Sequence, residues 1–355
     1  MKEQRQGEEK EQKSQAGKDH FPQLLVVSLG PIGIVTYGAR GCQGGTKTGP
    51  GRGGRRSEKT NDLIKQSEDR LAILSEIARL EKEGIFDVDT EKDPPTIPLM
   101  PGEADYLNEK IGSKVKTTIA NTLGYGFLLE MLRRNQLIIK EIYGIENLES
   151  VDGGAMLTCN HFNPMDVFAV EVAFMQAKLK RKKLYKVIRE GNYTNFPGFY
   201  GYLFRNSNTL PLSSNVSTMT EFVRAVDTIF SVDKDFILMY PEKSLWWNYK
   251  KPKQLQNGAY KLAAKNGVPV VPIFITMKNS DKIGSDGFPI LEYYLHIEKP
   301  IYPDEKLTVK ENVQVMKKKN FICWKNIYEN FYNKPLEYTT TSPELSPLKI
   351  LEENK

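Results

Sequence analysis

The chain has 355 residues, of which 39% are hydrophobic, and its 16 Phe and 17 Tyr are enough to bury a sizeable core. Its formal net charge of +6 suits anionic partners such as phosphate groups, a membrane surface or nucleic acid, without choosing among them. The cysteines Cys42, Cys159 and Cys323 are too far apart for a disulfide framework and lack metal-ligand spacing, which favours a reducing, cytoplasmic setting.

Residues 1–60 are expected to be a disordered tail, because 1–23 are almost all polar and 38–60 are rich in Gly and Arg. The apolar run at 24–37 is too short for a membrane span and contains Gly and Pro, so no transmembrane helix and no secretion signal are expected. The GPGRGG stretch at 49–54 matches G-x-G-x-x-G, but no βαβ unit frames it, so we interpret it as low-complexity sequence.

Residues 61–135 are predicted to be a helical N-terminal segment. Leu and Ile at helical spacing predict an amphipathic helix over about 62–83, and four prolines then break the chain at 93–102. A second helix is predicted over about 113–135, with apolar residues along it and basic residues near both ends. This helix could pack on the following domain or lie at a membrane interface, since amphipathicity fits both.

From residue 136 onward, short apolar runs alternate with segments of helical length. The predicted strands are at about 137–142, 155–159, 184–188, 236–240, 268–275 and 291–297, and the predicted helices at about 165–178, 217–232, 255–266 and 310–332. This alternation predicts an α/β domain over 136–332, with a mixed, largely buried sheet flanked by helices. Residues 333–355 are expected to form a loosely ordered C-terminal tail.

The first candidate functional site is at residues 158–166, TCNHFNPMD, which form a loop between a predicted strand and a predicted helix. Ligands bind at strand ends of α/β sheets. Asp166 lies in the first turn of the helix and could reach His161. A carboxylate on one imidazole nitrogen leaves the other nitrogen free to accept a proton. The spacing of five residues also arises by chance, so the pair alone is weak evidence.

A second stretch, YPEKS at 240–244, follows a predicted strand and delivers Glu242, Lys243 and Ser244 to another sheet edge. An exposed carboxylate and ammonium there would suit a polar substrate. A solvated, charged turn is the alternative interpretation.

Asn160, His161 and Asp166 match the N-H-x4-D motif of the glycerolipid acyltransferases, the PlsC-like superfamily that includes the lysophosphatidic acid acyltransferases. The chain resembles this family further in three blocks that follow in the family's order, at 197–212, 240–244 and 268–273. Four ordered blocks are far more specific than any one of them. The resemblance implies a PlsC-like acyltransferase fold for the α/β domain.

The resemblance implies transfer of a fatty acyl group from acyl-CoA or acyl-ACP to a hydroxyl of a glycerol-phosphate or lysophospholipid-type acceptor, as in phospholipid biosynthesis. His161 would be the general base and Asp166 would orient its imidazole. No metal and no cofactor beyond the acyl donor are implied, and an acyl carrier protein is a candidate partner. The expected substrate-binding residues are Asn160, Arg205, Glu242, Lys243 and Ser244.

The chain departs from the family at the usual phosphate-contacting positions. Its third block has Lys243, Ser244 and Leu245 where the family pattern F-P-E-G-T-R-S has Gly, Thr and Arg, and the second block ends in Ser213 and Ser214 instead of reaching an Arg. Either Arg205, Lys243 or another base replaces these arginines, or the acceptor is not a simple glycerol phosphate. A catalytically weak module that binds a lipid or a protein partner is the alternative function.

The stretch WWNYKKPK at 246–253 combines aromatic residues that favour the bilayer interface with lysines that favour anionic headgroups. This pattern predicts a cytoplasmic protein bound peripherally to the inner face of a membrane. Aromatic residues packed inside the protein are the alternative. Nucleic-acid binding through GRGGRR is not expected, because no recognition motif accompanies that segment.

Overall fold

The computed structural model describes residues 52–91 and 96–341, with side chains from Gln66 onward except that of Ser67. These residues all belong to one compact unit. The predicted tail up to residue 51, including the run at 24–37, lies outside the described residues, and so does the end of the predicted C-terminal tail, 342–355.

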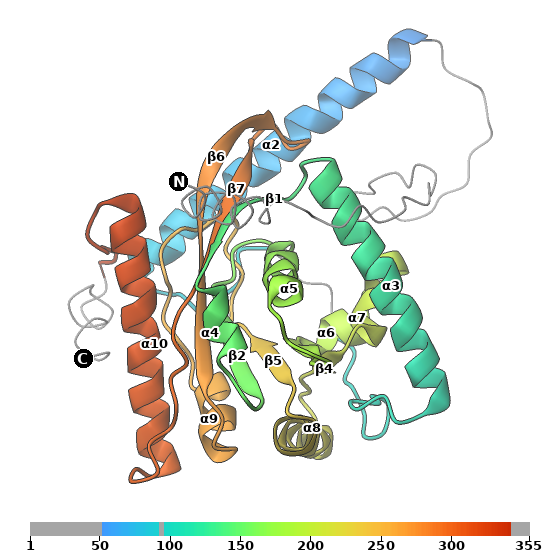
Figure 1. Cartoon of the computed structure of the whole chain (residues 1–355). Helices are drawn as coiled ribbons and strands as arrows, with labels where there is room; N and C mark the ends of the chain where they lie inside the picture. The colour runs from blue at the N-terminus through green and yellow to red at the C-terminus, as the bar shows by residue number, and fades with distance from the viewer. Residues whose placement is uncertain (1–51, 92–95, 342–355) are drawn as a thin grey trace, which may run out of the picture. The chain divides into compact units, whose positions relative to one another are not determined.

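A mixed sheet forms the centre of the domain (Figure 1). Its strands are β1 Ile138–Tyr143, β2 Ala155–Cys159, β3 Leu184–Ile188, β4 Thr209–Pro211, β5 Phe236–Met239, β6 Val270–Ile283 and β7 Pro289–Ile297. The six predicted strands are confirmed. Strand β4 was not predicted, because a strand of three residues is too short to show a period of two.

The strands lie in the order β1-β7-β6-β2-β5-β3-β4. Neighbouring strands are parallel except β6 and β7, which are antiparallel, so the predicted mixed sheet is confirmed. All five residues of β2 are buried, as expected for a central strand with helices on both faces. Strand β6 runs eight residues beyond the predicted end at 275 and continues its pairing with β7 there.

The helices are α2 Arg52–Glu83, α3 Ile111–Arg133, α4 Ile145–Glu149, α5 Asp166–Gln176, α6 Glu190–Thr194, α7 Gly198–Asn206, α8 Val216–Thr228, α9 Gly258–Lys265 and α10 Val309–Tyr332. A π-helical turn, Ile229–Asp233, continues α8. The short helices α4, α6 and α7 were not predicted, because they span too few turns to show helical periodicity. Helix α2 begins ten residues before its predicted start, so 52–60 are helical rather than disordered. Arg, Glu and Lys in that stretch are good helix formers.

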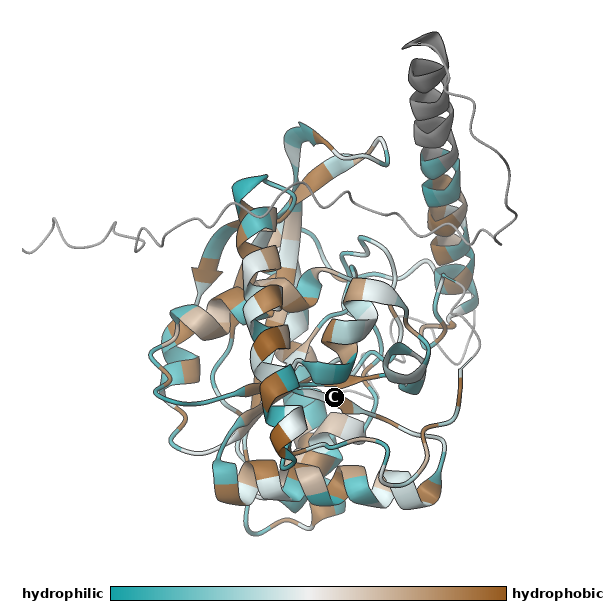
Figure 2. Ribbon diagram, turned by 90° about the vertical axis from the view of Figure 1, so that its right-hand side faces the viewer, coloured by the Kyte–Doolittle hydropathy of each residue, from teal (hydrophilic) through white to brown (hydrophobic). Residues whose placement is uncertain are grey.

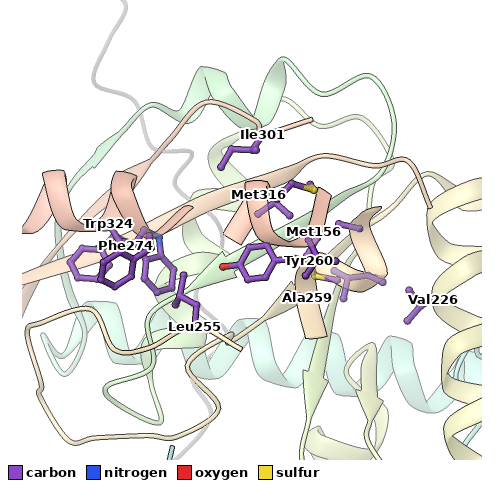
Figure 3. Close-up of a cluster of buried hydrophobic side chains, with 14 of the residues drawn as sticks. Met156, Val226, Leu255, Ala259, Tyr260, Phe274, Ile301, Met316 and Trp324 are labelled. Atoms are coloured by element: carbon purple, nitrogen blue, oxygen red, sulfur yellow. The ribbon is translucent and has the colours of Figure 1, made fainter. Parts of the chain in front are cut away.

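Successive residues along a strand face opposite sides of the sheet, and two hydrophobic cores result. Ala155 and Leu157 of β2 face a core shared with α3, α4 and α5. Met156 faces a second core shared with α2, α8, α9 and α10. Figure 1 shows α9 and α10 on one side of the sheet and α5 on the other, and Figure 3 shows Met156 packed among side chains of the second core. Both faces of the central strands are therefore covered, except where the strand ends meet loops.

Helix α3 buries one side and leaves apolar residues on the other. Ala120, Leu128 and Met131 are buried. The exposed apolar side chains of the helix are Ile111, Val115, Ile119, Leu123, Tyr125 and Leu129. Figure 2, which views the molecule from the side of α3, shows its apolar turns. One face of α3 thus packs on the domain, and the opposite face is apolar and exposed, as a helix at a membrane interface would be. Within the described residues, none of the helices is long and apolar enough to span a membrane.

Two expectations about aromatic residues and the tail are corrected. Trp246 and Trp247 are buried, so they pack inside the protein instead of facing a membrane. The tail beyond residue 332 is anchored as far as it is described, because Leu336 and Tyr338 are buried in the second core. The backbone N–H of Thr339 also donates to a carboxylate of α2. This anchoring was not predicted, although the alternation of Leu336 and Tyr338 places both side chains on one side of an extended segment.

Candidate active site

Strands β2 and β5 are parallel neighbours in which Thr158 pairs with Met239, so they end side by side. The loop after β2 carries His161 and the segment after β5 carries Tyr240 and Glu242. The two stretches that sequence analysis placed on separate strand ends are therefore brought together at one edge of the sheet, where α/β proteins bind ligands.

His161 and Asp166 form the predicted pair. Asp166 begins α5, and its Oδ2 lies 2.9 Å from Nδ1 of His161. The same oxygen accepts hydrogen bonds from the backbone N–H groups of Phe162 and Asn163, at 3.0 and 3.2 Å. The Asp166 side chain is 1% exposed and that of His161 is 23% exposed. With Nδ1 donating to the carboxylate, Nε2 keeps its lone pair and can accept a proton.

Tyr240 is a third member of this group that sequence analysis did not select. Its hydroxyl donates to Oδ1 of Asp166 at 2.7 Å, and its ring stacks on His161 with centroids 4.1 Å apart. Burial and the nearby Asp166 carboxylate raise the pKa of Tyr240, which keeps its hydroxyl a neutral donor. The only sequence signal was a Tyr where the resembled family's third block begins with Phe. Tyr240 therefore restricts both the carboxylate and the imidazole.

Glu242 is buried, and the expectation that its carboxylate is exposed is wrong. Its Oε2 accepts from the backbone N–H of His161 at 3.0 Å, and its Oε1 accepts from the backbone N–H of Lys253 at 2.8 Å. The carboxylate thus joins the two loops from the inside. It holds the main chain of His161 in place.

Lys253 is the partner of Glu242 and was missed by sequence analysis, which treated the lysines of 246–253 alike. Its side chain is 1% exposed, and its ammonium lies 3.2 Å from Oε2 of Glu242. It also donates to the backbone carbonyls of Ser244, at 2.8 Å, and His161, at 3.3 Å. Burial lowers the pKa of Lys253, and the charge and hydrogen bond of Glu242 act in the opposite direction. Both the N–H and the C=O of His161 are therefore fixed by one buried ion pair.

Asn160 and Ser244, also predicted at the site, are buried and engaged with the protein. The Asn160 amide accepts from the backbone N–H of Ile275 at 2.8 Å and donates to its carbonyl at 3.1 Å, which extends the pairing of β2 with β6 beyond the strand. The hydroxyl of Ser244 donates to the carbonyl of Phe86 at 2.6 Å. These contacts shape the backbone around the site.

Arg205 and Lys243 are exposed. The guanidinium of Arg205, near the end of α7, donates to the carbonyls of Tyr193 and Phe196, so it closes the loop between α6 and α7. Lys243 has a left-handed backbone, with φ of 68°, at the position where the family pattern has Gly. Its ammonium pairs with Asp87 at 3.1 Å.

Another cation, Arg189, lies beside the third block and was not predicted. It follows the end of β3 and donates to the carbonyl of Lys243 at 3.0 Å. It also forms an ion pair with Asp89. Its position just after a predicted strand, at the same edge of the sheet as His161, was the sequence signal that could have identified it as a site residue. Within the described residues, no group of three or more His, Cys, Asp or Glu side chains gathers to hold a metal ion.

Comparison with known proteins agrees with the four blocks. Residues 140–276 match the family model described as Acyltransferase, and this range contains all four. None of the curated proteins compared with the chain matches its sequence. The structure is similar to the crystal structure of the 1-acyl-sn-glycerophosphate (LPA) acyltransferase PlsC from Thermotoga maritima, with a TM-score of 0.39 and 15% identity, covering 81% of this chain and 100% of that one. The match to the Acyltransferase family model thus covers the segment 140–276, which contains the His161–Asp166 pair.

Proposed function

We propose that the protein is an O-acyltransferase that moves a fatty acyl group from acyl-CoA or acyl-ACP to a hydroxyl of a glycerol-phosphate or lysophospholipid-type acceptor. The observation that carries this proposal is the geometry of His161. Its Nδ1 is bonded to the buried Asp166 carboxylate, and its ring is partly exposed at the carboxyl edge of the sheet.

In the proposed reaction, Nε2 of His161 takes the proton of the acceptor hydroxyl as that oxygen attacks the thioester carbonyl carbon. The Asp166 carboxylate stabilises the imidazolium that forms. The tetrahedral intermediate then collapses, and the C–S bond breaks. The departing thiolate takes the proton from His161, so that the products are an ester and the free thiol of the donor, and the enzyme returns to its starting state.

Three other side chains near His161 have supporting roles in this proposal. Glu242 and Lys253 fix the backbone of His161, while Tyr240 restrains its ring and the Asp166 carboxylate. General bases act efficiently only when held within a few tenths of an ångström of the productive position. Acyl transfer therefore accounts for these buried contacts, because it requires a precisely held base. A module that only binds a lipid or a partner has no such requirement.

The protein is proposed to act at a membrane surface through α3. The exposed apolar side chains of this helix include Ile119 and Leu123, and basic residues lie near both of its ends. Such a helix can lie in the interface with its apolar side inward. Loss of vesicle binding on the double change Ile119→Ser/Leu123→Ser is expected in cosedimentation. The control is Val216→Ser/Val232→Ser, which removes two exposed apolar side chains from α8 and the turn after it.

The function is tested by measuring acyl transfer by the purified protein from labelled acyl-CoA and acyl-ACP. The acceptor panel contains glycerol 3-phosphate, lysophosphatidic acid, other lysophospholipids and neutral glycerolipids. The expected result is ester product that requires His161. A folded His161→Ala protein that retains wild-type turnover would refute the mechanism, and absence of product with every donor and acceptor would favour a lipid- or partner-binding module instead.

A further inference from the structure

Residues 86–89, Phe-Asp-Val-Asp, cross the third block of the site and are called here the acidic segment. Three hydrogen bonds fix it there: Ser244 Oγ to the Phe86 carbonyl at 2.6 Å, Leu245 N–H to Asp89 Oδ1 at 2.6 Å, and Trp246 Nε1 to the Val88 carbonyl at 2.7 Å. A stretch about 155 positions earlier in the sequence therefore covers the segment that follows β5. The acidic segment carries two carboxylates to this place.

The carboxylates of the acidic segment neutralise the cations next to the third block. Asp87 pairs with Lys243 at 3.1 Å, and Asp89 pairs with Arg189. Arg189 is held further by its hydrogen bond to the Lys243 carbonyl. Lys243 and Arg189, the two cations beside the third block other than the buried Lys253, are thus engaged by the protein's own carboxylates. A phosphate group bound there would have to compete with them.

A third carboxylate, Glu190, stands at the end of the second block. It accepts from Ser213 Oγ at 2.8 Å, from the backbone N–H of Ser214 at 3.2 Å and from that of Leu99 at 2.7 Å. Burial works against its ionisation, but these hydrogen bonds outweigh burial and hold the pKa of Glu190 below its ordinary value. Where sequence analysis noted Ser213 and Ser214 in place of an arginine, the structure therefore places an anion.

Phe86 anchors the acidic segment to the core, so the segment is a fixed part of the structure and not a movable inhibitory element. The Phe86 side chain is 3% exposed and stacks on Trp246, with centroids 5.5 Å apart. It also meets the edge of Tyr338 at 5.1 Å. Withdrawing the segment would expose these aromatic rings and break its hydrogen bonds. Its carboxylates are permanent components of the site.

We infer that the site selects a hydroxyl acceptor without a phosphomonoester, such as a zwitterionic lysophospholipid or a neutral glycerolipid. The inference rests on the proposed function and narrows its acceptor class. A phosphomonoester carries close to two negative charges and is normally bound by charge-assisted hydrogen bonds from cations. Beside the Glu242–Lys253 pair, whose charges cancel, three carboxylates, Asp87, Asp89 and Glu190, accompany two cations, Lys243 and Arg189, so a dianion meets net repulsion. An acceptor with no charge, or with balanced charges, does not.

The test is the double change Asp87→Asn/Asp89→Asn in the full chain. Asparagine keeps the oxygen that accepts from the Leu245 N–H and removes both negative charges. Asp87→Asn alone is a second variant, because Asp87 is about half exposed and its change cannot disrupt the core. The matched control is Asp227→Asn, which removes a carboxylate paired with Lys265 on α9, away from the third block. Glycerol 3-phosphate binding is measured by calorimetry, and transfer is measured to phosphomonoester and other acceptors.

The wild type is expected to transfer to acceptors without a phosphomonoester with the higher kcat/KM. The double variant should bind glycerol 3-phosphate about tenfold or more tightly than the wild type. It should also raise the ratio of kcat/KM for lysophosphatidic acid to kcat/KM for a neutral acceptor by about tenfold or more. Asp87→Asn should give part of this gain and Asp227→Asn none.

Wild-type preference for a phosphomonoester, or a double variant with unchanged affinity for glycerol 3-phosphate, would overturn the inference while leaving the acyltransferase proposal intact. Failure of the proposed function has a different signature, since His161-dependent product would then be missing with every acceptor. The affinity of the double variant for glycerol 3-phosphate, measured by calorimetry, would still report on the charge of this site, because a binding measurement needs no turnover.

Discussion

Replacement of Lys253 by Met should damage both stability and catalysis, because it removes the cation from a fully buried ion pair. The Lys253 and Glu242 side chains are 1% and 2% exposed, and the ammonium also satisfies the carbonyls of His161 and Ser244. Leaving one member of such a pair without its partner typically costs about 3–5 kcal/mol. Met has a similar length and fills the space beside Trp246, so the loss measures the charge and its hydrogen bonds and not a cavity.

The catalytic effect of this change follows from the same contacts. His161 is held through its N–H by Glu242 and through its C=O by Lys253. A displacement of the base by about 1 Å can lower the rate by about 100-fold. We expect Lys253→Met to lower kcat more than it raises KM for the acceptor, because the pair touches the base and not the exposed surface.

The assay combines urea unfolding with steady-state kinetics at a temperature where the variant stays folded. The matched control is Lys265→Met, since Lys265 forms an exposed pair with Asp227 and its loss should cost no more than about 1 kcal/mol. The double variant Lys253→Met/Glu242→Gln should recover part of the stability, because no unpaired charge remains buried. If Lys253→Met matched Lys265→Met in both unfolding free energy and kcat, the positioning role of the pair would be refuted.

Three further predictions concern the imidazoles and their partners. Asp166→Asn should lower kcat by about 10⁴-fold with little change in KM, because an amide no longer fixes the Nδ1–H tautomer of His161; a loss below tenfold in single-turnover kinetics would contradict this. Tyr240→Phe should lower the free energy of unfolding in urea by about 1–3 kcal/mol and kcat by no more than about tenfold, because Asp166 loses one hydrogen-bond donor while the ring stack on His161 remains. A loss of kcat as large as that of Asp166→Asn would show that the Tyr240 hydroxyl does more than position Asp166 and His161. Burial lowers the pKa of His296 to about 4, so as the pH falls below 6.5 the unfolded chain takes up this proton before the folded chain does. The contribution of neutral His296 to the free energy of unfolding is therefore fully present above pH 6.5 and should fall by up to about 3 kcal/mol towards pH 4. His296→Gln should remove that part of the pH dependence of unfolding, and identical pH profiles for the two proteins would disprove it.

The sequence predicted the candidate base and its orienting carboxylate because the two are local to each other. Asp166 lies five residues after His161, in a loop between a strand and a helix, and the helix start turns the carboxylate back onto the loop. The longer strands and helices were predictable for a similar reason, since their hydrophobic periodicity extends over consecutive residues. Short elements such as β4 and α6 contain too few residues to show a periodicity.

What only the tertiary structure decided is which side chains near the site face inward and which partners they meet. Glu242 and Lys243 are adjacent in the sequence, yet one is buried under His161 and the other is exposed, because the turn after β5 points successive side chains to opposite sides. Burial, and with it the pairing of Glu242 with Lys253, depends on contacts from other loops.

The charge balance beside the third block likewise could not be predicted from the sequence. Asp89 meets Arg189 across 100 positions of the chain, and no local pattern records such a pairing. By itself the sequence determined an α/β domain with a His–Asp pair and four acyltransferase-like blocks, since the strands, the helices and the blocks are each recorded in consecutive residues. The tertiary structure decided that carboxylates from a distant segment neutralise its cations, because chain folding alone brings those charges within reach of each other.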